Sequence, residues 1–250
     1  MSPDNQGALP DSTTGATGPI SPDTFRRVRS ALAGPSRAPG WPFPVVLIDG
    51  PSGAGKTTFA EALLARGAIA GHRLHCLHLD AIYPGWHGLS AGSAVVDDLL
   101  YGKAMPAHTP CSSHKSSSYG VPRPRLWKKG GCAYVRTWDW RADKPGKALR
   151  IEPGPLIIEG CGAITRCSAQ VAALSLWVDI RPSRLPMNEA GAPAHMDPAP
   201  PLSPEARRRQ RALHRDGDIY APWWEIWAAQ ERDHWRRNHP ARRADLHLWT

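Results

Sequence analysis

The residues that point most directly to chemistry are the eight from Gly50 to Thr57, which read Gly-Pro-Ser-Gly-Ala-Gly-Lys-Thr. They match the phosphate-binding Walker A pattern G-x-x-x-x-G-K-[S/T] at every required position. Glycines let successive backbone N–H groups turn toward phosphate oxygens, and the start of a helix adds partial positive charge there. Lys56 is expected to reach the β- and γ-phosphates of ATP or GTP, and Thr57 to ligate Mg²⁺. The residues expected to contact the nucleotide are Gly50, Pro51, Ser52, Gly53, Ala54, Gly55, Lys56, Thr57 and Thr58.

The segments on either side of this loop are expected to be a strand and a helix. Residues 45–48 are a continuous run of β-branched and apolar side chains, as in a strand buried on both faces of a parallel sheet. Residues 57–66 have helical spacing, with Phe59 and Leu63 on one side and Gly67 beyond the end. A strand, a loop and a helix in this order are the context that the motif requires.

Two acidic residues follow predicted strands. Asp80 comes after the strand expected over residues 73–79, and Glu159 ends the apolar run that begins at Pro155. In open parallel sheets, ligands bind outside the carboxyl ends of the strands, so both acids should lie near the phosphate loop. There Asp80 would accept a proton from an attacking hydroxyl, with a helix cap or turn as the alternative role. Glu159 would hold Mg²⁺ through water, opposite Thr57.

An aromatic stretch is the candidate for binding a second substrate. It mixes indoles, a carboxylate and guanidinium groups, which suits an apolar ring that carries several polar groups. Aromatic pairs across neighbouring strands are an equally good explanation, and the sequence leaves the two open. The residues proposed for this role are Tyr134, Trp138, Asp139, Trp140 and Arg141.

Residues 203–217 predict a capped helix that is rich in arginine. Arg207, Arg211 and Arg215 are four residues apart and share one face. A row of guanidinium groups would suit triphosphate oxygens and the charge that develops during phosphoryl transfer. A solvated basic face is the alternative.

Composition favours one α/β domain. The chain has 250 residues, 41% of them hydrophobic, and a formal charge of +9. This charge implies a polyanionic partner, for which we favour a nucleotide over nucleic acid because no nucleic-acid-binding module is recognisable. The five cysteines form no C-x-x-C pair and are expected to be reduced thiols. With no signal sequence and no apolar run of about 20 residues, we expect a soluble, cytoplasmic protein.

The chain divides into a tail and a main domain. Residues 1–40 are expected to be a flexible tail with one short helix, capped by Ser21 and apolar at Val28 and Leu32. Residues 41–250 would form the main domain, with irregular insertions at 101–129 and 183–204. The threefold spacing of His108, Cys111 and His114 in the first insertion is not taken as a zinc site, which needs four ligands.

The chain resembles the uridine-kinase-like branch of the P-loop kinases, and closely the ATP-binding, uridine-kinase-like proteins of actinobacteria. It does so over residues 40–250, outside the insertions, through six motifs in order: GPSGAGKTT, HLDAIYPGW, YVRTWDW, LIIEGCGA, RRRQRALHRDG and WWEIWAAQERDHW. The resemblance implies a five-stranded parallel sheet flanked by helices, an arginine-rich lid, and Mg·ATP as the phosphoryl donor.

Residue by residue, the resemblance implies that Asp80 is the base toward a sugar hydroxyl and that Tyr83 is its aromatic neighbour. It also implies that Asp139 binds the nucleoside, that Glu159 lies near magnesium, and that Arg211 and Arg215 belong to the lid. The implied activity is transfer of the γ-phosphoryl group to a hydroxyl, with a pyrimidine nucleoside such as uridine or cytidine as the favoured acceptor.

One departure from the family leaves the acceptor open. The family has a histidine soon after the position of Asp139, whereas residues 140–145 contain none. The alternatives are a kinase for another hydroxyl metabolite, such as a vitamin or sugar acid, and a non-catalytic regulatory module that binds ATP.

Overall fold

A five-stranded parallel sheet forms the centre of the computed structural model, which describes residues 20–67, 71–102, 120–181 and 202–250. The strand order is β2-β6-β1-β7-β8, and every neighbouring pair is parallel. The expected α/β class is confirmed, including the number of strands. The strands are β1 (Val45–Asp49), β2 (His75–His78), β6 (Leu156–Glu159), β7 (Leu174–Asp179) and β8 (Leu246–Trp249).

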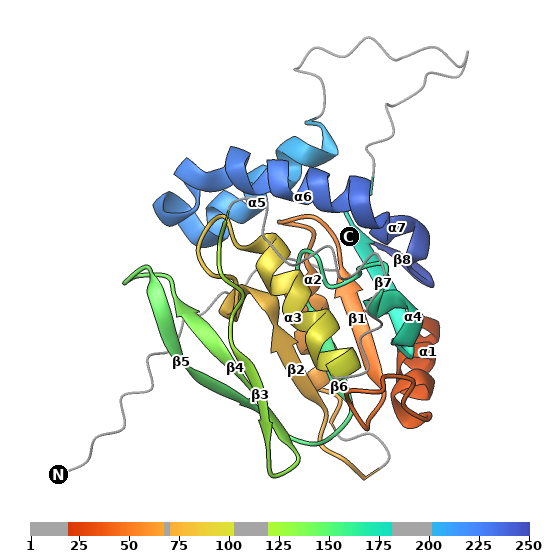
Figure 1. Ribbon diagram of the computed structural model, residues 1–250. Coiled ribbons are helices and arrows are strands. Elements are labelled where there is room, and N and C mark those ends of the chain that lie inside the picture. Colours follow the sequence, from red (N-terminus) through yellow and green to blue (C-terminus); the bar gives the residue numbers. More distant parts are fainter. Residues whose placement is uncertain (1–19, 68–70, 103–119, 182–201) are drawn as a thin grey trace, which may run out of the picture.

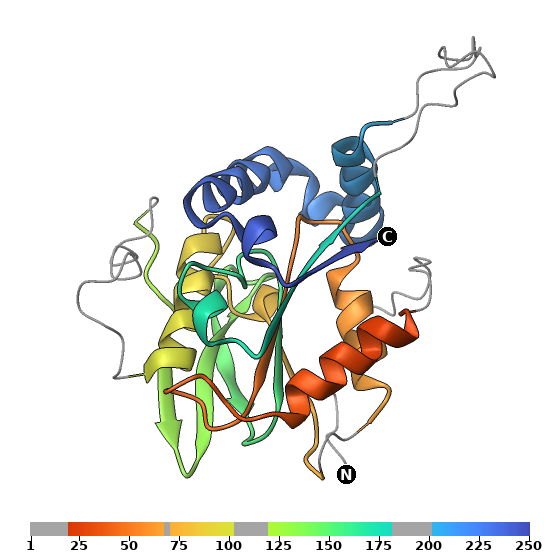
Figure 2. The same ribbon diagram turned by 90° about the vertical axis from the view of Figure 1, so that its right-hand side faces the viewer.

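Helices cover both faces of this sheet, and β1 shows why. All five of its residues are buried. Val46 and Ile48 pack with α1 (Pro22–Ala33) and α2 (Lys56–Leu64), whereas Val45 and Leu47 pack on the opposite side. That side is covered by α3 (Leu89–Tyr101) and α4 (Ser168–Val171), as Figures 1 and 2 show. A continuous apolar run is what a strand between two helical layers requires.

The short helix expected after the tail is present as α1. The hydroxyl of Ser21 accepts a hydrogen bond from the backbone N–H of Thr24 at 3.1 Å, and Pro22 begins the helix. Val28 and Leu32 are buried against the central sheet, as their spacing predicts. The predicted tail before residue 20 lies outside the described residues.

A second, antiparallel sheet flanks α3, with the order β3-β4-β5. Its strands are β3 (Leu126–Lys129), β4 (Cys132–Asp139) and β5 (Lys144–Ile151). The irregular insertion expected over 101–129 is therefore wrong at both ends, because Tyr101 closes α3 and residues 126–129 pair with β4. A four-residue strand with two lysines has little pattern of its own, and only pairing with β4 makes it a strand. The remaining part, 103–119, lies outside the described residues, as do 182–201.

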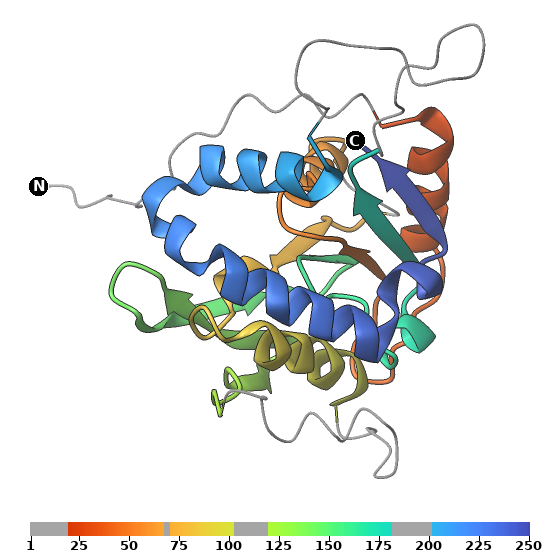
Figure 3. The ribbon, with the colours of Figure 1, turned by 90° about the horizontal axis from the view of Figure 1, so that it is seen from above.

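The carboxyl ends of the central strands lie beneath α5 (Pro204–Asp216) and α6 (Trp224–Asn238), which Figure 3 shows from above. Two 3₁₀ turns, η4 (Gly217–Ile219) and η5 (Ala221–Trp223), join these helices, and α7 (Pro240–Arg243) leads into β8. The structure thus has an arginine-rich helix, α5, at the edge where the sequence analysis expects the ligand.

Two further findings concern the length of the helices and the state of the cysteines. No helix in the described part of the chain is long and apolar enough to cross a membrane. Cys76, Cys132 and Cys161 carry free thiols, as expected, but Cys167 is disulfide-bonded, so the expectation of reduced thiols throughout is wrong at this residue.

Candidate functional site

The phosphate loop lies between β1 and α2, in the predicted arrangement. Its glycines at 50, 53 and 55 have φ values of +150°, +77° and +91°, which L-residues rarely adopt. Gly53 is also closely covered, because a Cβ atom there would lie 2.2 Å from the carbonyl oxygen of Arg208 on α5. Glycine is therefore required both by the turn and by the helix that packs over it.

Lys56 is buried at the first turn of α2, with only 7% of its surface exposed. Its ammonium group donates to the carbonyl of Pro51 at 3.0 Å and to the sulfur of Cys161 at 3.3 Å. Burial works to lower the pKa of Lys56, but the acidic groups around it act more strongly and raise the pKa above its usual value. These groups are Cys161, Glu159, Glu231 and Asp80. The lysine is a fixed positive charge at the loop.

Thr57 and Glu159 lie in direct contact at the edge of the sheet. The Thr57 hydroxyl donates to Oε1 of Glu159 at 3.2 Å. A hydroxyl and a carboxylate are the oxygen ligands that Mg²⁺ prefers, so this pair fits the predicted metal. Among the described residues no cluster of three or more His, Cys, Asp or Glu could hold a metal.

His78 is a neighbour of this pair that the sequence analysis missed. Its Nδ1 lies 2.6 Å from the same Oε1 of Glu159. Hydrogen bonds with Cys76 and Glu159 raise the pKa of His78 to about 11, so its imidazole carries a positive charge beside the buried carboxylate. The sequence offers one indication, because His78 and Glu159 both lie at the ends of predicted strands. In the register of β2 and β6 the two residues are opposite each other.

Asp80 follows β2 directly, in the 3₁₀ turn η1 (Leu79–Ala81), at the edge that the phosphate loop occupies. The residue is exposed to solvent. Desolvation by neighbouring protein atoms and the charge of Glu159 nevertheless raise the pKa of Asp80, while Arg215 and Lys56 act in the opposite direction. A carboxylate with a raised pKa near a fixed lysine is suited to accept a proton.

The two arginines predicted for the lid have different surroundings. Arg215 lies close enough to Asp80 to lower the pKa of that carboxyl group, and its guanidinium pairs with Asp216 at 2.7 Å. Arg211 instead donates to the Thr250 hydroxyl at 3.1 Å, and that hydroxyl donates to the carbonyl of Ala54 in the phosphate loop. Both arginines are on α5, but only Arg215 acts directly on the proposed base.

The aromatic stretch divides into two groups. Trp140 belongs to the site, because its indole N–H donates to the backbone carbonyl of Asp80 at 2.8 Å. Trp138 lies beside Gly85, in the loop that leads to α3. The register of β4 and β5 shifts between Arg136 and Trp138, where Gly146 and Lys147 of β5 lie opposite Thr137 alone.

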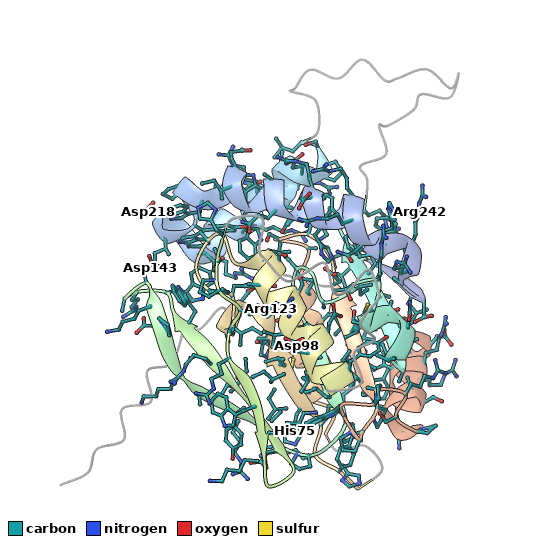
Figure 4. The ribbon with its side chains drawn as sticks, in the orientation of Figure 1. His75, Asp98, Arg123, Asp143, Asp218 and Arg242 are labelled. Carbon is teal, nitrogen blue, oxygen red and sulfur yellow. The ribbon has the colours of Figure 1, made fainter. Side chains whose placement is uncertain are left out.

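The other members of the stretch do not join the site. Tyr134 stacks on Trp127 of the neighbouring strand, with ring centres 5.4 Å apart, so for this residue the cross-strand explanation holds. The Asp139 carboxylate accepts hydrogen bonds from the backbone N–H groups of Arg141 and Ala142, which makes it a cap of the β4–β5 turn. Figure 4 shows the labelled Asp143 at the tip of the same hairpin. Arg141 is exposed there.

The expectation that Tyr83 lies beside the acceptor is wrong. The residue is fully buried, its hydroxyl donates to the carbonyl of Cys161 at 2.7 Å, and its ring meets Trp227 edge-on at 4.9 Å. With no exposed surface it cannot contact an acceptor. The 3₁₀ turn that contains Asp80 is followed by this side chain in the core beneath the site, which no sequence pattern indicates.

Glu231 on α6 is the main site residue that the sequence analysis missed. Its Oε1 accepts hydrogen bonds from the N–H and the hydroxyl of Ser52, at 2.9 and 2.7 Å. The same oxygen accepts from the indole of Trp227 at 3.1 Å and lies 3.1 Å from the sulfur of Cys161. Helical spacing is the sequence pattern that could have identified Glu231, because it shares one face of the helix with Trp224 and Trp227. An acid on such an apolar face must find buried partners.

Asp49, the last residue of β1, ties the phosphate loop to the segment after β6. It is fully buried and accepts from the backbone N–H groups of Gly50, Gly162 and Ile164 at 2.7 to 2.9 Å. His234 of α6 lies 3.5 Å from its second oxygen. The residue therefore fixes the position of the loop without being placed to contact a ligand.

Comparisons with known proteins give two similar solved structures. One is a "putative fructose transport system kinase" from Silicibacter sp. TM1040, with 14% identity and a TM-score of 0.46. The other is a "possible uridine kinase" from Bacillus stearothermophilus, with 14% identity and a TM-score of 0.44. In both cases the match covers 90% of this chain and 97% of the chain in the solved structure. No protein-family model and no curated protein matches the sequence. The fold is assigned by its strand order and its phosphate loop.

Proposed function

We propose that this protein is an ATP-dependent kinase that transfers the γ-phosphoryl group to a hydroxyl of a small acceptor. The observation that supports this most is the gathering of four elements at one edge of the sheet. The phosphate loop presents Lys56, the Thr57–Glu159 pair offers oxygen ligands, and Asp80 lies near both. Arg215 comes to the same place from α5. Phosphoryl transfer depends on positioning and on charge stabilisation, which these groups provide.

Each group has a separate part in this proposal. Lys56 and Arg215 neutralise the negative charge that spreads over the transferred phosphoryl group. Thr57, and Glu159 through water, would hold Mg²⁺, which would supply further positive charge to the phosphates. Asp80 accepts the proton of the acceptor hydroxyl, and its raised pKa brings its basicity closer to neutral pH. The donor is ATP in this proposal, and the protein acts on small molecules in the cytoplasm.

The acceptor proposed is a pyrimidine nucleoside. Trp140 is bonded to the backbone of Asp80 and lies 4.6 Å from Trp86, ring centre to ring centre. Trp86 in turn stacks on Tyr220 at 5.3 Å, so aromatic surface extends from the proposed base to the α5–α6 connection. Such surface suits a planar ring, whose ribose hydroxyl would then face Asp80.

The test is ATP consumption by the purified protein with Mg²⁺ and a panel of acceptors, with Lys56→Ala as the blank. The panel holds uridine, cytidine, purine nucleosides, sugar acids and vitamins that carry a hydroxyl. Turnover that depends on uridine or cytidine supports the full proposal. Turnover with another acceptor keeps the kinase and replaces the nucleoside. ATP binding without turnover on any acceptor contradicts the kinase and favours a regulatory ATP-binding module.

A further inference from the structure

The sheet β3-β4-β5 has one face in the core and one face in solvent. Ala133, Val135 and Ile151 are buried and pack with the core around α3. Side chains alternate along strands, so the residues between them point to the other face. We call this the basic sheet face, and in Figure 1 the helices lie on the opposite side of the sheet. It consists of Arg125, Trp127, Lys129, Tyr134, Arg136 and Arg150.

This region holds most of the net charge of the protein. Residues 120–152 contain nine Lys and Arg against three Asp and Glu, a balance of +6 within a chain of +9. Five of the eight arginines of α5 and α6, the most obvious basic clusters in the sequence, take part in ion pairs. Arg208 pairs with Asp179, Arg215 with Asp216, Arg232 with Glu205, and both Arg236 and Arg237 with Asp233. The two helices carry eight arginines against five Asp and Glu, a balance of +3, so the larger excess of positive charge lies in residues 120–152.

The aromatic rings and the guanidinium groups form one row across the three strands. Arg125 lies over the ring of Trp127 at 5.5 Å. Trp127 stacks on Tyr134 at 5.4 Å, with 10° between the ring planes. Arg150 is directly opposite Tyr134 in the register of β4 and β5. Since neighbouring strands lie about 4.8 Å apart, the row spans roughly 10 Å from β3 to β5.

This arrangement is poor for the stability of the sheet itself. Like charges on neighbouring strands destabilise a sheet, and opposite charges stabilise it. Within the described part of the chain, the acid that accompanies this row is Glu152, which pairs with Arg150 at 3.0 Å. Arg136 donates to a backbone carbonyl, that of Gly146. A second copy of this chain would bring the same positive charge, so the face is complementary to a polyanion instead.

We propose that the basic sheet face binds single-stranded nucleic acid. Arg125, Lys129, Arg136 and Arg150 would contact phosphates, and Trp127 and Tyr134 offer ring surface for bases. A duplex hides its bases and would use only the charges of this face, as would an anionic membrane, whereas a single strand can also contact the two half-buried rings. This inference does not rest on the proposed kinase activity, and it departs from the preference, drawn from the sequence, for a nucleotide over nucleic acid as the polyanionic partner.

The test is fluorescence anisotropy of a labelled 12-nucleotide oligo(dT) and oligo(U) titrated with the full-length protein. Four phosphate contacts predict that log K against log salt has a slope of about −3. The charge variant Arg125→Gln/Arg136→Gln/Arg150→Gln should weaken binding at least tenfold. Its matched control is Arg26→Gln/Arg27→Gln/Arg29→Gln, which removes the same charge from the exposed side of α1 and should bind within twofold of the wild type.

Further probes distinguish single-stranded nucleic acid from other polyanions. They also distinguish oligonucleotide binding from the proposed kinase activity. An abasic oligomer of the same length should bind at least tenfold more weakly, because it offers no bases to the rings. Lys56→Ala should bind the oligonucleotide as the wild type does, whatever its effect on ATP turnover. The proposal is overturned if both triple variants lose affinity equally, or if duplex DNA, the abasic oligomer or phosphatidylserine vesicles bind as tightly as the single strand. Circular dichroism confirms that each variant is folded.

Discussion

At the scale of the residue, the site depends on a few charged groups held by buried partners. Asp80 is influenced by Glu159, which raises its pKa, and by Arg215 and Lys56, which lower it. Glu159 has its own partners in Thr57 and His78. Each substitution at this edge therefore changes the groups that remain, and matched pairs of variants are needed to separate these effects.

The role of Asp80 as a base predicts a specific kinetic change. Asp80→Asn keeps the size of the side chain and removes its basicity, so kcat should fall by about 10² to 10⁴. The affinity for ATP, measured by calorimetry, should change by less than about threefold, because the phosphates are held by the loop. An Asp80→Asn protein with a nearly normal kcat would remove this residue from its proposed role.

The pH dependence of the reaction provides a second test of the same residue. A base with a raised pKa loses activity as the pH falls through that pKa, so the acid limb of kcat/KM should lie above the range of an ordinary aspartate. Arg215 holds this pKa down, so Arg215→Gln should move the acid limb to higher pH. Arg211→Gln is the matched control, since Arg211 bonds to Thr250 and should leave the limb in place. Equal shifts in the two variants would contradict the assignment.

Glu231 is predicted to act through the phosphate loop. Glu231→Ala leaves the N–H of Ser52 and the indole of Trp227 without their acceptor, which should cost about 2 kcal/mol in the free energy of unfolding. Glu231→Gln keeps an oxygen for both donors and should recover most of that loss. Urea denaturation measures both variants. If they are equally unstable, the charge and not the acceptor is what the loop requires.

At the scale of the element, the contact between the phosphate loop and α5 decides how the two halves of the site meet. The carbonyl of Arg208 approaches Gly53 more closely than any side chain allows. On the other side, Thr250 at the end of β8 bonds to Ala54 and to Arg211. The loop is thus held between α5 and the last strand.

Alanine substitutions at two glycines distinguish the effect of backbone strain from the effect of this contact. Gly53 and Gly67 both have positive φ, +77° and +89°, but a Cβ atom at Gly67 would meet nothing within 4 Å. Gly67→Ala should cost about 1 to 2 kcal/mol of stability through strain alone. Gly53→Ala should cost that and also displace α5, so amide hydrogen exchange in α5 should become faster in this variant only. The same exchange rates in both variants would show that α5 does not depend on the contact.

At the scale of the whole molecule, a buried acid on α3 links stability to pH. Asp97 is 2% exposed and accepts a hydrogen bond from Thr165 at 2.6 Å, which joins α3 to the segment after β6. Burial raises its pKa to about 7, although the bond from Thr165 works in the opposite direction. The folded protein therefore holds a proton in a pH range where the unfolded chain releases it.

This linkage predicts a loss of stability with rising pH. Between the unfolded pKa near 4 and the folded pKa of about 7, the free energy of unfolding should fall as the pH rises, and the contribution of Asp97 should be constant above that range. From pH 5 to 7 the fall should be about 2 kcal/mol. The Asp97→Asn variant should not show this fall in the free energy of unfolding. The Asp23→Asn variant, an exposed change on α1, should still show it. Urea denaturation at each pH measures the effect, and parallel curves for all three proteins would contradict it.

The sequence by itself determined the features that depend on local pattern. The phosphate loop, its strand and helix, the caps of α1 and α5, and the acids at the ends of β2 and β6 follow from residue types at fixed spacing. Because parallel strands bring their carboxyl ends to one edge, local pattern is also enough to place Thr57, Glu159 and Asp80 together.

Only the tertiary structure decided which side chains those elements present to one another. Trp140 bonds to the backbone of Asp80 whereas Tyr134 stacks on Trp127, and the chain after a 3₁₀ turn buries Tyr83. Glu231 reaches Ser52 from 179 positions away in the chain, and pairing with β4 turns residues 126–129 into a strand with a basic face. The physical reason is the same in each case: the free energy of these contacts comes from partners distant in sequence, and no local pattern encodes which partners they will be.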